Sequence, residues 1–137
     1  MTVTYAALLR VNSEVNKLPY RLDIERYKTA EFWTEIEEEG DCEDYMIAKI
    51  QRLKALGLPI SAMRIVTCFV QPYKTRDEKA NRGHAVLAVD LDGTTYFLDI
   101  GNDLPIDADL YPHELHKIQY AGSPRFEWAE GADRSFA

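Results

Sequence analysis

The stretch GHAVLAVDLDGTTYFLDI, residues 83–100, decides the fold of this chain. Its first part, residues 83–90, and its last part, residues 94–100, have an apolar period near two, which predicts two strands. Asp92-Gly93, between them, is a strong signal for a tight two-residue turn. The stretch therefore predicts an antiparallel hairpin.

The turn also predicts the register of this hairpin. With a two-residue loop, Val86 faces Asp99 and His84 faces Gly101. Opposed residues point to the same face of a sheet, as do residues two apart along a strand. His84 and Asp99 then share a face as diagonal neighbours, with about 7 to 8 Å between their backbones. A four-residue loop keeps this register, whereas a three-residue loop would put the two side chains on opposite faces.

The segments around the hairpin supply more strands. Residues 63–73, MRIVTCFVQPY, predict a strand, and residues 74–82, KTRDEKANR, predict a polar loop. HKIQYAG (116–122) and RFEWA (125–129) predict short edge strands. The last residues, 131–137, predict a flexible tail.

A helix is predicted at the start of the chain. Leu8, Val11, Val15 and Leu18 recur at helical spacing, which predicts an amphipathic helix over about residues 3–17.

A second helix is predicted after Gly40, over about residues 42–56. Asp41 is a suitable N-cap, and Asp44 follows three residues later as an acidic variant of the capping box. Gly57 supplies the C-cap. Helices that precede an antiparallel sheet predict a single α+β domain over residues 1–137.

Composition excludes several classes of protein. The 137 residues carry a net charge of -7, which argues against nucleic acid as a partner because phosphate binding needs clustered Lys and Arg. No apolar run is long enough to span a membrane. The first residues lack the pattern of a signal peptide, so we expect synthesis in the cytoplasm, with a periplasmic or virion location left open. Two cysteines are too few for a disulfide framework.

Cys42 is the candidate nucleophile. As the first residue of the predicted helix it would lie beside unpaired backbone N–H groups, which lower the pKa of a thiol and can bind an oxyanion. Seven of the ten residues from Glu35 to Asp44 are acidic and oppose thiolate formation. A protonated histidine or a bound cation could offset them. The alternative interpretation is that Cys42 only packs in the core.

Cys42, His84 and Asp99 would be nucleophile, base and base-orienting residue if the fold brings them together. A strand histidine is more often a core or surface residue, so the triad is a hypothesis. Cys68, in the middle of a predicted strand, is predicted to be a core residue. His113 and His116 lack the spacing of a zinc-binding helix and are predicted to lie on a solvated face.

The sequence resembles the bacterial transglutaminase-like cysteine proteinases over about residues 12–104. The specific part of the pattern is GDCEDYMIAK (40–49) followed by GHAVLAV (83–89) and YFLDI (96–100). Weaker matches are VN at 15–16, Tyr20, Asp23, Tyr27, FW at 32–33, Glu35, Leu53, Gly57 and Arg64 to Val66. The resemblance implies a papain-like, transglutaminase-like fold in which Cys42 is the nucleophile, His84 the base and Asp99 the third member.

The resemblance also implies calcium, bound by Asp41 and Glu43 with Asp44 as a possible helper. Calcium prefers oxygen ligands, and the dication would neutralise part of the acidic field around Cys42. Alternatively, Asp41 only caps the helix, and Glu43 and Asp44 only favour its dipole. Periplasmic relatives carry a leader, which we do not expect here, so their substrate is not carried over.

We therefore expect a cysteine peptidase or amidase that hydrolyses a peptide or isopeptide bond of a protein substrate through a thioester acyl-enzyme. Acyl transfer to an amine, as in a transglutaminase, uses the same chemistry up to the last step. A different class of protein is also compatible with the sequence: a catalytically silent module that binds calcium or a protein, for example in a virion.

Overall fold

The computed structural model describes residues 3–17, 40–72, 74–80, 82–100, 102–120, 126–129 and 132. Within this part of the chain, one antiparallel sheet has six strands in the order β4-β3-β2-β1-β5-β6. The strands are β1 (Met63–Phe69), β2 (Gly83–Leu91), β3 (Thr94–Asp99), β4 (Asn102–Asp107), β5 (Glu114–Tyr120) and β6 (Phe126–Trp128).

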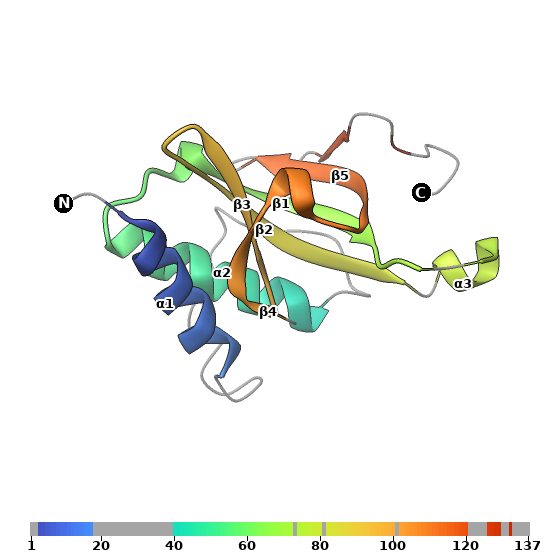
Figure 1. Ribbon diagram of the computed structural model, residues 1–137, viewed down its shortest axis with the longest axis horizontal. Helices are drawn as coiled ribbons and strands as arrows, with labels where there is room; N and C mark the ends of the chain where they lie inside the picture. Colours follow the sequence, from blue (N-terminus) through green and yellow to red (C-terminus); the bar gives the residue numbers. More distant parts are fainter. Residues whose placement is uncertain are drawn as a thin grey trace.

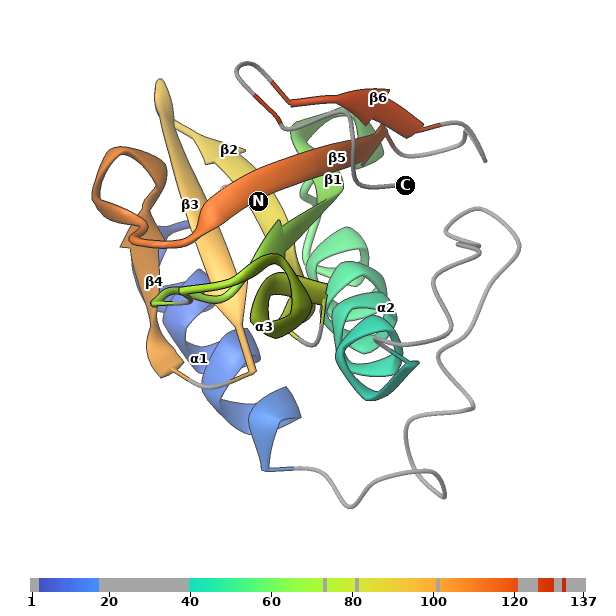
Figure 2. The ribbon, with the colours of Figure 1, turned by 90° about the vertical axis from the view of Figure 1, so that its right-hand side faces the viewer.

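Two long helices, α1 (Tyr5–Asn16) and α2 (Gly40–Ala55), lie together on one side of this sheet, as Figures 1 and 2 show. The shorter elements are α3 (Arg76–Ala80) and the 3-10 turns η3 (Ile60–Ala62) and η4 (Ala108–Leu110). The predicted α+β fold, with helices first and the antiparallel sheet after them, is confirmed.

The 83–100 hairpin forms in the predicted register. Leu91 pairs with Thr94, and the pairing continues to Leu87 with Leu98. Asp92 and Gly93 have φ of +51° and +82°, as expected for a tight hairpin turn with both central residues left-handed. Because the turn has two residues, His84 and Asp99 are brought to one end of the sheet.

The two faces of the sheet bury different sets of side chains. The helical face forms the main core, in which Leu8 and Val15 of α1 meet Ile50 of α2 and Leu87 and Leu98 of the hairpin, all fully buried. A smaller cluster on the other face joins Val66, Val86, Ala88 and Phe97 to Tyr111, Leu115 and Ile118. Strand alternation puts His84 on this second face, together with Val86 and Ala88.

The first helix is confirmed, because α1 covers Tyr5–Asn16 and is capped by Thr4, whose side chain accepts a 3.3 Å hydrogen bond from the Ala7 amide. The second begins two residues earlier than predicted. Gly40 already has helical geometry, so the prediction of Asp41 as the N-cap is wrong and Cys42 is the third helical residue. Cys42 still lies in the first turn, where backbone N–H groups have no acceptor within the helix.

The predicted polar loop at 74–82 contains the short helix α3. Thr75 Oγ1 accepts a 3.1 Å hydrogen bond from the Glu78 amide, and Glu78 Oε2 accepts one of 2.7 Å from the Lys74 amide. This is a variant of the capping box in which Glu78 binds the amide before Thr75, and the Thr-x-x-Glu spacing of residues 75–78 was its sequence signal.

The end of the sheet also differs from the prediction. β4 was not predicted because Pro105 interrupts its pattern, although an edge strand tolerates proline. β6 is an edge strand as predicted, whereas β5 lies between β1 and β6. The strand order could not be predicted from the sequence, because β5 pairs with β1, which is distant along the chain. The predicted tail, 131–137, lies outside the described residues except for Ala132.

Among the helices of the described residues, none combines the length and the apolar character needed to cross a membrane.

Candidate active site

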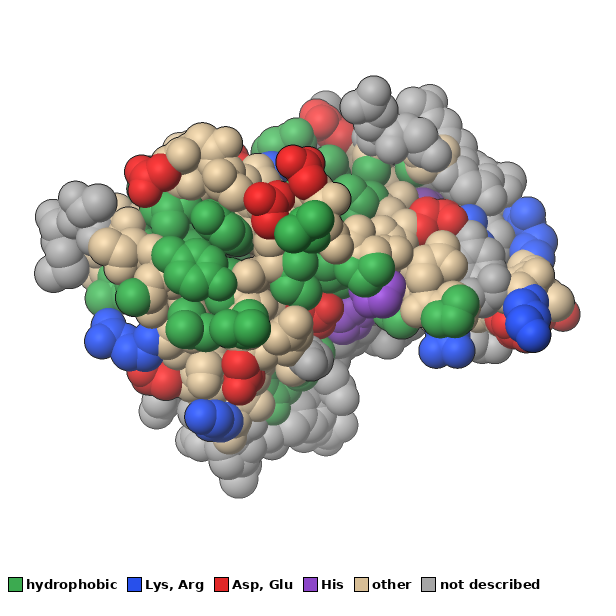
Figure 3. Space-filling model, viewed as in Figure 1, with side chains coloured by type: hydrophobic (Ala, Val, Ile, Leu, Met, Phe, Trp, Pro, Cys, Tyr) green, Lys and Arg blue, Asp and Glu red, His purple; other side chains and the backbone are tan. Residues whose placement is uncertain are grey.

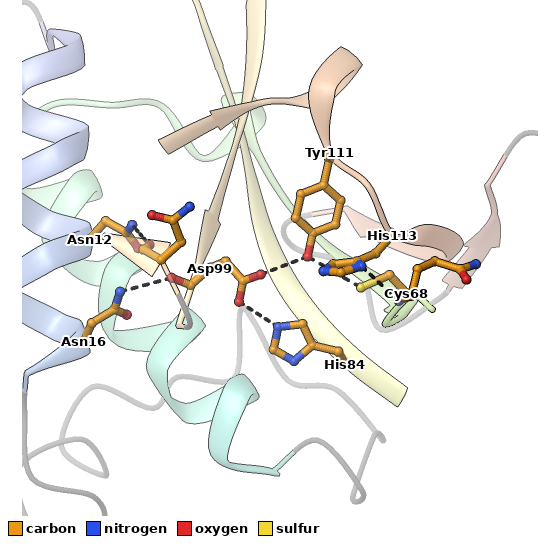
Figure 4. Close-up of polar contacts among 9 residues, drawn as sticks. Asn12, Asn16, Cys68, His84, Asp99, Tyr111 and His113 are labelled. Atoms are coloured by element: carbon orange, nitrogen blue, oxygen red, sulfur yellow. Dashed lines mark hydrogen bonds and ion pairs between the residues drawn. The ribbon is translucent and has the colours of Figure 1, made fainter. Parts of the chain in front are cut away.

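His84 and Asp99 form a close pair at the end of the central hairpin. His84 Nε2 lies 2.7 Å from Asp99 Oδ1, and the side chains keep only 15% and 11% of their surface exposed. An ionised carboxylate can only accept hydrogen bonds, so Nε2 carries the proton in this contact. The predicted proximity of the two side chains is confirmed, and Figure 4 shows them turned toward one another from adjacent strands.

The second oxygen of Asp99 also has a partner. The hydroxyl of Tyr111, which follows η4, donates a 2.9 Å hydrogen bond to Asp99 Oδ2. The Tyr111 ring meets Phe97 edge to face, with 4.7 Å between ring centroids. Burial, followed by the nearby Cys68 and Asp99, raises the pKa of Tyr111 far above its ordinary value. Tyr111 therefore stays a neutral donor at any physiological pH.

Cys68 lies directly opposite His84 in the pairing of β1 with β2. It is 1% exposed and is not in a disulfide, so its prediction as a core residue is confirmed. Its Sγ also lies 3.8 Å from the Tyr111 hydroxyl, a polar contact that the sequence did not indicate.

The prediction that His113 and His116 lie on a solvated face is wrong. His113 is half-buried: its Nδ1 accepts a 3.0 Å hydrogen bond from the Gln71 amide, and its ring packs edge to face on Tyr111 at 5.0 Å. Burial, helped by the charge of His84 and opposed by that of Asp99, lowers the pKa of His113. His116 is 6% exposed and packs against the Phe69 ring at 4.9 Å.

The pairing of β5 with β1 explains this error. His116 is buried against Phe69 of β1, a contact that depends on which strands pair and not on local polarity.

Two side chains of helix α1 donate hydrogen bonds to main-chain carbonyl oxygens at the same site. Asn16 Nδ2 donates a 3.0 Å hydrogen bond to the Asp99 carbonyl oxygen. One turn earlier, Asn12 Nδ2 donates to the carbonyl oxygens of Asn102 and Asp103, both at 2.8 Å. Asn12 is fully buried, which is unusual for an amide side chain. The only feature of the sequence that could have indicated this role of Asn12 was its position between Val11 and Val15, on an otherwise apolar face of the helix.

The remaining predicted site residues are Cys42, Asp41 and Glu43. All three lie in the first turn of α2, which begins at the end of the sheet where β3 ends and β2 begins (Figure 1). Their side chains, and that of Asp44, lie outside the described part of the structure. The roles of Cys42 as nucleophile and of the acidic residues as calcium ligands therefore stay predictions.

Histidine side chains reach the surface beside an acidic side chain in the space-filling view (Figure 3). His84 Nε2 is held by Asp99, so Nδ1 is the ring nitrogen that would exchange a proton with a reacting group. Among the described residues, no group of three or more His, Cys, Asp or Glu could hold a metal ion. The arrangement is that of an oriented general base.

Comparison with known proteins identifies similar sequences and structures. The family model for bacterial transglutaminase-like cysteine proteinases matches residues 2–109. Calcium-bound LapG of Legionella pneumophila has a similar structure, with a TM-score of 0.62 and 24% identity over 93% of this chain and 70% of that chain.

Two further LapG structures are also similar. LapG without a stated ligand gives a TM-score of 0.60 at 23% identity, covering 93% of this chain and 69% of that chain. EGTA-treated LapG gives a TM-score of 0.55 at 22% identity, covering 90% of this chain and 70% of that chain. No curated protein matches the sequence. At these identities the structural similarity shows the fold, and the family model supports a cysteine peptidase.

Proposed function

Because the chain belongs to the family of bacterial transglutaminase-like cysteine proteinases, we propose that it hydrolyses peptide or isopeptide bonds through Cys42, His84 and Asp99. The observation that carries this proposal is the 2.7 Å contact between His84 Nε2 and Asp99 Oδ1. It lies at the end of the sheet where α2, the helix of Cys42, begins. A histidine oriented by a buried carboxylate is suited to activating a thiol.

In the proposed reaction, His84 Nδ1 takes the proton of the Cys42 thiol and the sulfur attacks the substrate carbonyl carbon. The C–N bond then breaks, and the amine leaves with the proton from Nδ1, which produces a thioester. Water gives a proton to Nδ1 and attacks the thioester. The C–S bond breaks and the sulfur takes the proton back from Nδ1, which releases the carboxylic acid and restores the Cys42 thiol and neutral His84.

The first turn of α2 supports two parts of this reaction. Its backbone N–H groups have no intrahelical acceptors, and the positive end of the helix dipole lies there. Both properties favour a thiolate at Cys42 and an oxyanion on the substrate carbonyl.

Calcium is part of the proposal, with Asp41 and Glu43 as ligands and Asp44 as a helper. Their carboxylates are the donor type that Ca²⁺ prefers, and the structurally similar LapG is described in calcium-bound and EGTA-treated forms. When bound, the dication would offset the acidic side chains around Cys42. Calcium should raise the thermal midpoint of the wild-type chain, and an Asp41→Asn, Glu43→Gln protein should lose this shift while keeping its fold.

The proposed substrate is a protein or peptide. Hydrolysis of a labelled protein should be lost in Cys42→Ala and kept in the matched Cys68→Ser protein. Iodoacetamide should alkylate Cys42 but not Cys68 under native conditions, because Cys68 is 1% exposed. A Cys42→Ala protein with full hydrolytic activity would refute the proposal.

The same assay separates the alternative functions. With a primary amine present, amine-capped products would show acyl transfer, whereas free carboxylates show hydrolysis. Absence of both products, together with equal reactivity of the two cysteines, would favour a silent binding module.

A further inference from the structure

The carboxylate of Asp99 is held at both oxygens. Oδ1 contacts His84 and Oδ2 accepts the Tyr111 hydroxyl, at 2.7 and 2.9 Å, while the Asn16 amide holds its carbonyl oxygen. Asp99 is 8% exposed, so these contacts are made in a largely dry environment. Figure 4 shows Tyr111 and His84 approaching Asp99 from different sides.

The direction of each hydrogen bond in this cluster can be assigned. Tyr111 has one hydroxyl proton, and the Asp99 carboxylate can only accept, so that proton points to Oδ2. The oxygen of Tyr111 is then the acceptor for the Cys68 thiol, whose Sγ lies 3.8 Å away. The order is Cys68 to Tyr111 to Asp99, with His84 donating to the other carboxylate oxygen. Successive hydrogen bonds of one direction polarise and strengthen one another.

Packing alone does not require the hydroxyl of Tyr111. Its ring already contacts Phe97 and His113 edge to face, at 4.7 and 5.0 Å, and phenylalanine would keep both contacts. The hydroxyl has a separate role, because a carboxylate bound at one oxygen can rotate about its last side-chain bond. A donor at the second oxygen blocks that rotation.

We propose that Tyr111 is a positioning residue that acts through Asp99: its hydroxyl fixes the carboxylate plane and so aims the His84 ring. The inference rests on the proposed function, since aiming His84 matters when Nδ1 exchanges a proton with Cys42. Tyr111 itself touches no reacting atom in this mechanism.

The test compares Tyr111→Phe with Tyr5→Phe. Tyr5→Phe also removes one hydrogen bond of a tyrosine hydroxyl, to the Pro105 carbonyl oxygen at 3.2 Å. Pro105 belongs to β4, which pairs with the edge of β3 that faces away from β2 and His84. Tyr111→Phe should lower kcat about ten- to hundredfold, the range for partners that orient histidines bound to metals, and leave KM within about twofold. Tyr5→Phe should keep the wild-type kcat and KM.

A pH profile separates positioning from a structural role. Without the Tyr111 donor, more negative charge remains on the Asp99 oxygen facing His84, which favours the imidazolium. A protonated His84 cannot take the proton of the Cys42 thiol, so the acidic limb of the kcat/KM profile should move to higher pH in Tyr111→Phe and stay in place in Tyr5→Phe. Equal kcat and equal profiles for wild type and Tyr111→Phe would overturn the inference.

Direct NMR observation of the His84 ring makes this test independent of catalysis. In the wild-type chain the nitrogen shifts should report a protonated Nε2, and Tyr111→Phe should move the ring's titration to higher pH. If the wild-type chain shows no Cys42-dependent hydrolysis but the His84 titration still moves in Tyr111→Phe, the proposed function fails and the effect of Tyr111 on His84 through Asp99 stands. If hydrolysis is present and the shift is absent, only the role of Tyr111 fails.

A second measurement covers a Tyr111→Phe protein that does not fold. In wild type the buried hydroxyl proton of Tyr111 should give a slowly exchanging downfield resonance. Asp99→Asn should move that resonance upfield, because the charged acceptor is gone. If the resonance does not move in Asp99→Asn, the hydrogen bond from Tyr111 to Asp99 is contradicted.

Discussion

Asp99→Asn removes the charge behind His84 at almost constant volume, and we expect it to abolish most of the hydrolytic activity. The two side chains are 15% and 11% exposed and meet at 2.7 Å, so solvent screens their interaction little. For charge centres roughly 4 Å apart, the attraction is about 4 kcal/mol at an effective dielectric constant of about 20. If the transition state contains a charged imidazolium, that energy corresponds to about a thousandfold loss in kcat.

A fluorogenic peptide assay with saturating substrate measures this loss directly. Asp103→Asn is the matched control, because Asp103 also accepts a hydrogen bond from Asn16, at 3.3 Å, but makes no contact with His84 among the described interactions. It should keep kcat within about threefold, as expected for an exposed surface pair. A decrease of less than tenfold in Asp99→Asn, in a protein that unfolds at the wild-type urea concentration, would refute the argument that His84 needs this charge.

Two further predictions concern stability. Gly93→Ala should lower the free energy of unfolding by about 1–2 kcal/mol in urea titrations, because φ is +82° at this position, although no atom lies within 4 Å of an added Cβ. Asp92→Gly, at φ +51°, should change the free energy of unfolding little. A larger loss in Asp92→Gly than in Gly93→Ala would contradict the turn assignment. The pKa of His113 is lowered in the folded chain, so its contribution to stability is present above about pH 6.5 and is lost as the pH falls through the folded pKa. Thermal midpoints between pH 8 and 5 should therefore fall less in His113→Gln than in wild type, and parallel curves would count against this assignment.

The sequence predicted the part of the site that is local in the chain. Asp92-Gly93 specifies the turn, the turn specifies the register, and the register brings His84 to Asp99, all within 18 residues. The same local signals located α1, α2 and the strands β1 to β3. The first turn of α2 was found within two residues, which is the usual uncertainty of a helix end.

The sequence did not predict the contacts made by the later strands. Tyr111 and His113 reach the site because β5 pairs with β1, across more than 40 residues of chain. No periodicity in one segment records which other strand it will pair with, so His113 looked like a surface residue. Cys68 was correctly placed in the core, but its polar neighbour Tyr111 comes from the same long-range pairing.

Helix α1 connects the two halves of the proposed triad. On one side Asn16 and Asn12 bind main-chain oxygens at the end of β3 and in β4. On the other side, Glu14 of α1 pairs with Arg52 of α2 at 3.2 Å, and the two helices share the main core. The surface ion pair contributes little, whereas the buried amide of Asn12 and the half-buried amide of Asn16 would lose their acceptors if α1 shifted. Asn12 and Asn16 therefore fix the helical layer, and with it the start of α2, against the strand end that carries Asp99.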